Sequence, residues 1–72
     1  FELPEAGRAT LRVYNIMGQQ VAELIDGTMQ AGIHRLDWRG TDDRERMLPS
    51  GIYFLTLSVS GIQLNRKILL VR

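Results

Sequence analysis

The fold class of this chain is decided by Pro49-Ser50-Gly51-Ile52-Tyr53-Phe54-Leu55-Thr56-Leu57, together with the closing run Lys67-Ile68-Leu69-Leu70-Val71-Arg72. A turn of proline, serine and glycine leads into an apolar run that begins with aromatic residues. The pair Ser60-Gly61 then reverses the chain into a second apolar run. The order of turn, strand, tight turn and strand is typical of a hairpin that closes a small all-β domain.

Outward from this hairpin, three shorter segments alternate apolar and polar residues with a period of two. Residues 1–3 alternate and stop at Pro4, which predicts an edge strand because proline cannot donate to a sheet ladder. Residues 9–14 and 33–38 continue the same alternation and predict half-buried strands. With the closing hairpin, this pattern favours an antiparallel β-sandwich.

The segment of residues 21–25 is ambiguous, because its spacing fits a helical turn as well as a strand. We interpret it as a strand, since Gly18 and an Asp26-Gly27 turn leave too little room for a useful helix. Residues 15–18 then form a hairpin loop in which Gly18 supplies a positive φ. Residues 28–32 and 40–48 are interpreted as loops, the second of them exposed.

The inner faces of the sandwich are expected to hold the apolar residues that alternate along each strand. Within the last hairpin, Tyr53 and Val59 share a face with two leucines. The expected inner residues are Leu11, Val13, Leu24, Leu36, Trp38, Leu55, Leu57, Ile68 and Leu70.

Composition and charge exclude several classes of function. The 72 residues carry a net charge of +1, which argues against nucleic-acid binding because that requires a clustered basic field. No apolar run approaches the roughly 20 residues that a membrane-spanning helix needs. The chain has no cysteine, so disulfides and thiolate metal sites are excluded.

The length corresponds to one domain, residues 1–72, and a chain this short is marginally stable alone. The chain begins with Phe1 inside a predicted strand. We interpret it as the C-terminal domain of a longer protein.

The residue types that usually carry catalysis are scattered, so we predict no enzyme activity, no cofactor and no metal site. His34 is the single histidine and has no nucleophile in a recognisable motif. Asp42 and Asp43 lack the spacing of a calcium loop and lie beside basic residues, so a self-neutralising loop is preferred and weak calcium binding is the alternative. Trp38 is interpreted as a core residue rather than a sugar-stacking platform.

The charges near the C-terminus leave two alternatives open. Lys67 and Arg72 could protect a solvated edge strand against aggregation, as cations commonly do. They could instead belong to a C-terminal tail that a receptor recognises.

The pattern as a whole resembles the C-terminal sorting domain, of type A, of proteins exported by the type IX secretion system. It is also similar to the related immunoglobulin-like domain of the flagellar hook-capping protein. The residues that carry the resemblance, in chain order, are Phe1-Glu2-Leu3-Pro4-Glu5-Ala6-Gly7, Leu11-Arg12-Val13-Tyr14-Asn15-Ile16-Met17-Gly18-Gln19, Ala31-Gly32-Ile33-His34, Trp38, Gly40, Ser50-Gly51-Ile52-Tyr53-Phe54 and Lys67-Ile68-Leu69-Leu70.

The resemblance implies an immunoglobulin-like antiparallel β-sandwich of about seven short strands with almost no helix. It implies a non-catalytic sorting signal that directs an N-terminal cargo domain through the type IX outer-membrane translocon, with cleavage and anchoring by sortase-like surface machinery. The protein would then be secreted or held at the cell surface, after passage through the periplasm of a Gram-negative bacterium of the Bacteroidetes type. The expected recognition residues are Gly51, Tyr53, Lys67, Ile68, Leu69, Leu70, Val71 and Arg72.

The sequence departs from the sorting-domain pattern at two places. The usual lead-in rich in Pro-Asn-Pro is absent before Phe1, and Arg39 with Arg44-Glu45 replaces the usual loop residues after Trp38. The alternative function is a structural immunoglobulin-like interaction or spacer module, in a multidomain extracellular enzyme or a protein of the hook-capping type. Carbohydrate binding through Trp38 is a third, weaker hypothesis.

Overall fold

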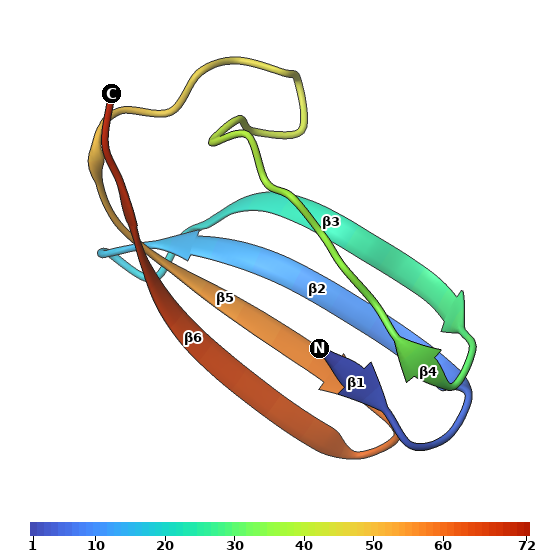
Figure 1. Cartoon of the computed structure of the whole chain (residues 1–72). Coiled ribbons are helices and arrows are strands. Elements are labelled where there is room, and N and C mark those ends of the chain that lie inside the picture. The colour runs from blue at the N-terminus through green and yellow to red at the C-terminus, as the bar shows by residue number, and fades with distance from the viewer.

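The computed structural model describes residues 1–72 and contains six strands and no helix (Figure 1). The strands are β1 (Glu2–Leu3), β2 (Gly7–Asn15), β3 (Gln20–Met29), β4 (Gly32–Ile33), β5 (Gly51–Val59) and β6 (Ile62–Leu70). The predicted all-β sandwich is confirmed, with six strands rather than seven. The structure contains no helix that could cross a membrane.

The two layers of the sandwich differ greatly in size. The larger sheet has four antiparallel strands in the order β3-β2-β5-β6, whereas the smaller sheet consists of β1 and β4. Figure 1 shows the short pair lying across the face of the large sheet, followed by an extended segment that rises from β4. The small layer therefore has too few strands to cover the whole inner face of the large one.

The closing hairpin forms as the sequence predicts. Strands β5 and β6 pair continuously from Gly51 opposite Leu70 to Val59 opposite Ile62. Between them, Ser60 and Gly61 have φ angles of 49° and 79°. Two central residues with positive φ match the twist of the flanking strands, and this explains the Ser-Gly choice at the turn.

The predicted turn at Asp26-Gly27 is wrong, because strand β3 continues through it. Gly27 pairs with Ala9 inside the β2–β3 ladder, and the Asp26 carboxylate accepts a hydrogen bond from Arg8 at 2.6 Å. The loop between β3 and β4 is therefore shorter than the predicted loop of residues 28–32, because β3 continues to Met29. Strand β3 has more residues than the part of β2 that it faces, and register shifts after Leu11 and Val13 accommodate the difference.

The strand predicted for residues 33–38 is also wrong in extent, because only Gly32–Ile33 are paired. The ladder between β4 and its partner strand β1 ends at the pair of Phe1 and His34, whose backbones exchange hydrogen bonds of 2.7 and 2.8 Å. Beyond that pair, the backbone of residues 35–38 makes no hydrogen bond. A strand-like sequence without a partner strand does not form a ladder.

The buried residues form two clusters, one at each end of the large sheet. Beneath β1 and β4 lie Leu3, Ala9, Leu11, Leu57 and Val59, and at the other end lie Val13, Ala22 and Tyr53. The second cluster is covered by the loop cover, a name we give to residues 38–48, whose Trp38 and Leu48 pack on it.

The expected inner residues are distributed over three degrees of exposure. Leu11, Val13 and Leu57 are buried as predicted. Half-buried are Leu24, Trp38, Leu55, Ile68 and Leu70. Leu36 is 42% exposed, so its prediction as a core residue is wrong, because no strand of the small layer lies beside it.

Candidate functional site

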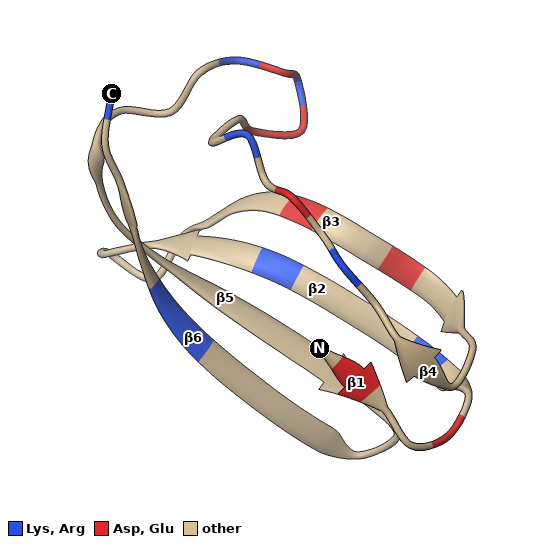
Figure 2. Ribbon diagram, in the orientation of Figure 1, with Lys and Arg blue, Asp and Glu red and all other residues tan.

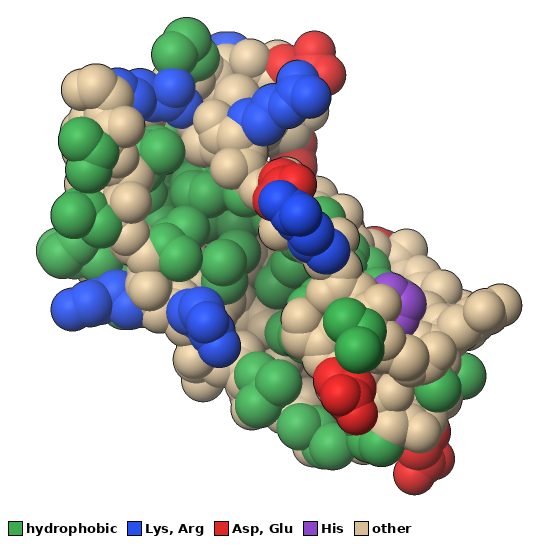
Figure 3. Space-filling view, viewed as in Figure 1, with side chains coloured by type: hydrophobic (Ala, Val, Ile, Leu, Met, Phe, Trp, Pro, Cys, Tyr) green, Lys and Arg blue, Asp and Glu red, His purple; other side chains and the backbone are tan.

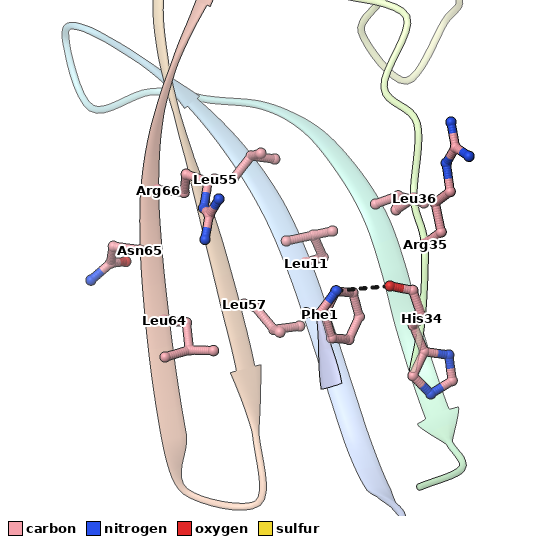
Figure 4. A pocket seen from close by; sticks show the side chains of 10 residues that line it. All are labelled: Phe1, Leu11, His34, Arg35, Leu36, Leu55, Leu57, Leu64, Asn65 and Arg66. Carbon is pink, nitrogen blue, oxygen red and sulfur yellow. Dashed lines mark hydrogen bonds between the residues drawn. The ribbon is translucent and has the colours of Figure 1, made fainter. Parts of the chain in front are cut away.

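An apolar groove lies between the two layers, over the part of the inner face of the large sheet that the small layer does not cover. Its volume is about 450 Å³. The floor is formed by side chains of β2, β5 and β6, and the wall by Phe1 and residues 34–36 (Figure 4). Figure 3 shows the hollow as a continuous hydrophobic area bordered by basic side chains.

The groove exposes large apolar side chains that a closed sandwich would bury. Leu64 on the floor is 53% exposed, and Phe1 and Leu36 on the wall are 39% and 42% exposed. Figure 4 shows Leu36 directed from its segment toward the groove. Contiguous apolar surface of this kind is characteristic of binding sites on soluble proteins.

The wall of the groove is fixed in place by local contacts. The two hydrogen bonds between Phe1 and His34 hold the N-terminus, and their rings stack with centroids 5.5 Å apart. The His34 Nε2 atom lies 2.7 Å from the carbonyl oxygen of Gln30, which anchors the ring on its other side. His34 therefore helps to fix the wall of the groove in place.

One cation stands on the groove face of β6 without a carboxylate partner. Arg66 follows Leu64 on the same face, lines the groove and has no ion pair. By contrast, Arg8 and Arg12 on β2 pair with Asp26 at 2.6 Å and Glu23 at 3.0 Å (Figure 2). The hydrogen bond to Glu23 raises the pKa of Arg12 above its ordinary value.

The predicted recognition residues lie along β5, β6 and the C-terminus, and their side chains divide into two groups. Tyr53 is 4% exposed, donates a hydrogen bond to the Pro49 carbonyl at 2.7 Å, and packs edge-on against Trp38. Ile68 and Leu70 pack on the buried cluster that contains Tyr53. Gly51, opposite Leu70, begins strand β5.

The second group faces solvent. Leu69 and Val71 are 70% and 76% exposed, and Lys67 is also exposed. These side chains alternate with the half-buried Ile68 and Leu70 at the end of β6. The structure therefore brings the predicted residues to one end of the sheet but does not gather all of their side chains into one accessible patch.

Arg72 ties the C-terminus to the loop cover. Its guanidinium donates to the carbonyl oxygens of Leu48 at 2.7 Å, Gly40 at 2.5 Å and Arg39 at 3.3 Å. Gly40 is buried with a φ of 74°, and a Cβ there would lie 2.7 Å from a methyl carbon of Leu70. Glycine at this position therefore permits the close approach of loop and tail.

Asp42 organises the exposed part of the loop cover. Its Oδ1 atom accepts the backbone amides of Arg44 and Arg46, both at 2.9 Å, and its Oδ2 atom accepts Arg46 Nε at 2.9 Å. The amide of Arg46, more than any other contact, lowers the pKa of Asp42 below its usual value. The self-neutralising interpretation of this loop agrees with these contacts.

The alternative of a calcium site at Asp42 and Asp43 gains no support from the side chains nearby. Asp43 accepts the amide of Glu23 at 2.9 Å, and no three His, Cys, Asp or Glu side chains are grouped where they could hold a metal ion.

The groove residues Phe1, Leu36, Leu64 and Arg66 are not predicted as a site from the sequence. A signal was present in the sequence, because Arg66 is a charged residue between Leu64 and Ile68 on the face of β6 that is otherwise apolar.

A second feature that was not predicted is the turn after β2, where Asn15 Oδ1 accepts the amides of Met17 and Gln19, both at 3.0 Å. This turn displays Met17 at 77% exposure, and an apolar residue in a hairpin turn was its signal.

Comparison with known proteins gives one family. A model of the FlgD Ig-like domain matches residues 1–62 of the 72, which cover β1 to β5 and the turn that follows. No curated protein and no solved structure matches the chain. The match agrees with the antiparallel β-sandwich described above, and the chain belongs to the FlgD Ig-like domain family.

Proposed function

We propose that this domain is a non-catalytic interaction module, an Ig-like domain of the flagellar hook-capping type that acts by contact with other proteins. The family match over β1 to β5 supports the structural part of this proposal. The observation that carries the contact function is the groove, because it combines exposed apolar side chains with a wall held rigid by Phe1 and His34. Rigid, preformed apolar surfaces bind with a small entropic cost.

The test places a photo-crosslinking amino acid at position 64 in the groove or at position 69, which lies on the opposite face of the same strand. The domain is expressed in the periplasm of a flagellated bacterium, and adducts are identified by mass spectrometry. The proposal predicts one discrete adduct from position 64 and none from position 69. Equal adducts from both positions, or none from either, would remove the support for an interaction module.

A type IX sorting signal is the second candidate, and the placement of the C-terminal segment favours it. Residues 63–72 lie outside the family match and comprise most of the edge strand β6 and the two residues that follow it, with Lys67, Leu69 and Val71 exposed. On this proposal, the type IX translocon and sortase-like surface machinery read these side chains. The N-terminal cargo domain then reaches the medium or the cell surface by way of the periplasm.

A reporter fused ahead of Phe1 in a type IX-competent bacterium separates the two candidates. Deleting residues 67–72 would also remove part of β6 and the hydrogen bonds of Arg72, so point variants are the sharper tool. Sorting predicts export of the intact fusion and retention of a Lys67→Glu, Leu69→Ser, Val71→Ser variant. The interaction module predicts that both fusions stay in the periplasm with the domain folded.

A further inference from the structure

We propose that two copies of this domain associate weakly through one end of the large sheet, where each copy inserts the apolar tip of a turn into a hollow of the other. The tip consists of the Ile16 and Met17 side chains, and we call it the turn knob. The end hollow is the depression of about 280 Å³ beside it. This surface shares no residue with the groove, so the inference goes beyond the proposed function and is tested separately.

The turn knob projects from the turn between β2 and β3 (Figure 1). Ile16 and Met17 are 73% and 77% exposed, at a place where turns normally carry polar residues. The Asn15 Oδ1 atom accepts the amides of Met17 and Gln19, both at 3.0 Å. The Asn15 carbonyl accepts the amide of Gly18 at 3.0 Å. Because these bonds hold the turn, burying the two side chains against a partner costs little conformational freedom.

The end hollow lies directly beside the turn knob. Asn15 pairs with Tyr53 in the β2–β5 ladder, which brings the turn to the start of β5. The lining of the hollow includes Pro49 and the half-buried Val21 and Ile52. A hollow of about 280 Å³ is smaller than ordinary ligand pockets and suits one or two aliphatic side chains.

Neither the turn knob nor the end hollow contains a charged residue. Both are formed by two uncharged runs, residues 13–22 and 47–65, in a chain of which 24% of the residues are charged. Depletion of charged residues, with methionine and aromatic residues present, is typical of the core of a protein–protein interface. A lipid surface is disfavoured as the occupant, because lipid-binding surfaces usually carry Lys or Arg beside their apolar residues.

A second copy is the occupant that fits both parts at once. A partner must offer an apolar side chain to the end hollow and a concave apolar site to the turn knob, and this chain carries both side by side. A two-fold axis between two copies exchanges them reciprocally, because the same patch of both copies meets across such an axis. An extended segment of the polypeptide outside residues 1–72 could enter the end hollow, but it offers no concave site for the turn knob. The net charge of +1 gives little repulsion between copies.

The experiment measures self-association of the 72-residue chain by sedimentation velocity and methyl NMR, at concentrations from about 0.05 to 2 mM. An interface built on two side chains and a hollow is at the small end for protein complexes, so we expect a dissociation constant on the order of 0.1–1 mM. The methyl signals of Met17 and Ile52 should shift with concentration. Those of Leu57 and Leu64, which line the groove, should not.

Matched variants locate the contact. Met17→Gln should weaken self-association about tenfold, because it brings an amide into an apolar hollow. Ile33→Gln is the control, since Ile33 is 84% exposed but lies in β4, beyond the far end of β3, and it should change nothing. Asn15→Ala keeps both side chains of the turn knob but frees the turn, and should weaken self-association about threefold. Met17 and Ile33 are largely exposed, so their variants are expected to fold.

A mixture of two variants tests the reciprocal exchange. A Met17→Gln copy keeps its end hollow, and an Ile52→Thr copy keeps its turn knob. A mixed pair therefore has one intact contact, whereas each variant alone has none. Equimolar mixing should restore part of the self-association. No recovery on mixing would mean that the two turn knobs meet each other instead, and would overturn the exchange.

Three further results would overturn the proposal. One is a folded domain that stays monomeric up to about 2 mM. Another is self-association that Met17→Gln leaves unchanged. The third is self-association that shifts the methyl signals of Leu57 and Leu64, which would place the contact at the groove. Crosslinking from position 64 tests the interaction module independently of all these results.

Discussion

The inner face of the large sheet is covered beneath the small layer and beneath the loop cover but is open beside them, although its sequence pattern is the same throughout. Leu57 and Leu64 are direct cross-strand partners on β5 and β6. Leu57 lies under the small layer and is 5% exposed, whereas Leu64 is 53% exposed. Alternation thus determines which face a residue takes, but burial depends on whether a second layer reaches that part of the sheet.

The two edges of the large sheet differ in a related way. On the β3 edge, the ladder to β2 has two register shifts, and its charges are paired with those of β2. On the β6 edge, the ladder is regular and Arg66 is unpaired. The open part of the sheet therefore combines exposed apolar surface, a regular edge and a free charge, which is the combination expected of a binding region.

The largest effect is expected from truncating the two cross-strand leucines separately. Leu57→Ala should lower the free energy of unfolding by about 2–5 kcal/mol, because it leaves a cavity in a covered core. Leu64→Ala should lower it by less than about 1 kcal/mol, since its side chain is largely solvated. Urea unfolding monitored by Trp38 fluorescence measures both. Equal losses at the two positions would show that the groove is closed in solution.

A smaller effect is expected beneath the loop cover. Tyr53→Phe keeps the edge-on contact with Trp38 but removes the hydrogen bond to the Pro49 carbonyl. The expected loss in the free energy of unfolding is about 0.5–1.5 kcal/mol. The same urea titration measures it. An unchanged free energy of unfolding would mean that the Tyr53 hydroxyl is hydrogen-bonded to water and that the core beneath the loop cover is loosely packed.

Removal of the Arg72 guanidinium should loosen the loop cover with a modest effect on the whole domain. Arg72→Ala removes the hydrogen bonds to the Leu48, Gly40 and Arg39 carbonyls, and at an exposed site we expect a loss of about 1 kcal/mol or less. Amide exchange in residues 40–48 should accelerate while the β2–β5 ladder is unaffected. Arg72→Lys, which cannot form the same fork, should resemble the alanine variant.

The smallest effect is a change of the loop cover with pH. Hydrogen bonds from Arg46 and Arg44 lower the pKa of Asp42 from its ordinary 3.8. A carboxyl group with a lowered folded-state pKa contributes stability that is present above the ordinary value and is lost as pH falls through the folded value. NMR shifts of the loop amides should therefore change only below about pH 3.8, and Asp42→Asn should abolish this change. A transition between pH 5 and 7 would contradict the assignment.

The fold was predictable where short-range patterns determine structure. The closing hairpin followed from Ser60-Gly61, and β2 from its alternation, because turn chemistry and a period of two are local properties. The turn at Asp26-Gly27 was predicted wrongly because a glycine inside a bulged ladder has the same sequence signal as a glycine in a turn. Ala9 and Ala22 were missed as core residues because small side chains carry little hydrophobic signal.

The candidate site was less predictable because it depends on pairing between distant segments. Leu36 has the alternation of a core strand, but burial of its side chain requires contact with a distant segment, which no pattern near it in the sequence reports. The C-terminal residues were selected by resemblance, and the structure shows that Tyr53 is buried and that the Arg72 side chain is bonded to backbone carbonyls. Arg66, the charge within the inward series of β6, was the one residue whose position in the sequence pointed to the groove.

Amide hydrogen exchange of the free domain compares covered and uncovered segments in one experiment, and so tests whether the inner face of the large sheet is open beside residues 35–38. We expect the amides of Leu36 and Trp38 to exchange at nearly the rate of an unstructured peptide, because neither makes a backbone hydrogen bond. We also expect strong protection in the middle of the β2–β5 ladder and intermediate protection for His34, whose amide donates to Phe1. Protection of Leu36 and Trp38 comparable to that of the central strands would show that the backbone of residues 35–38 is hydrogen-bonded and that the groove is closed.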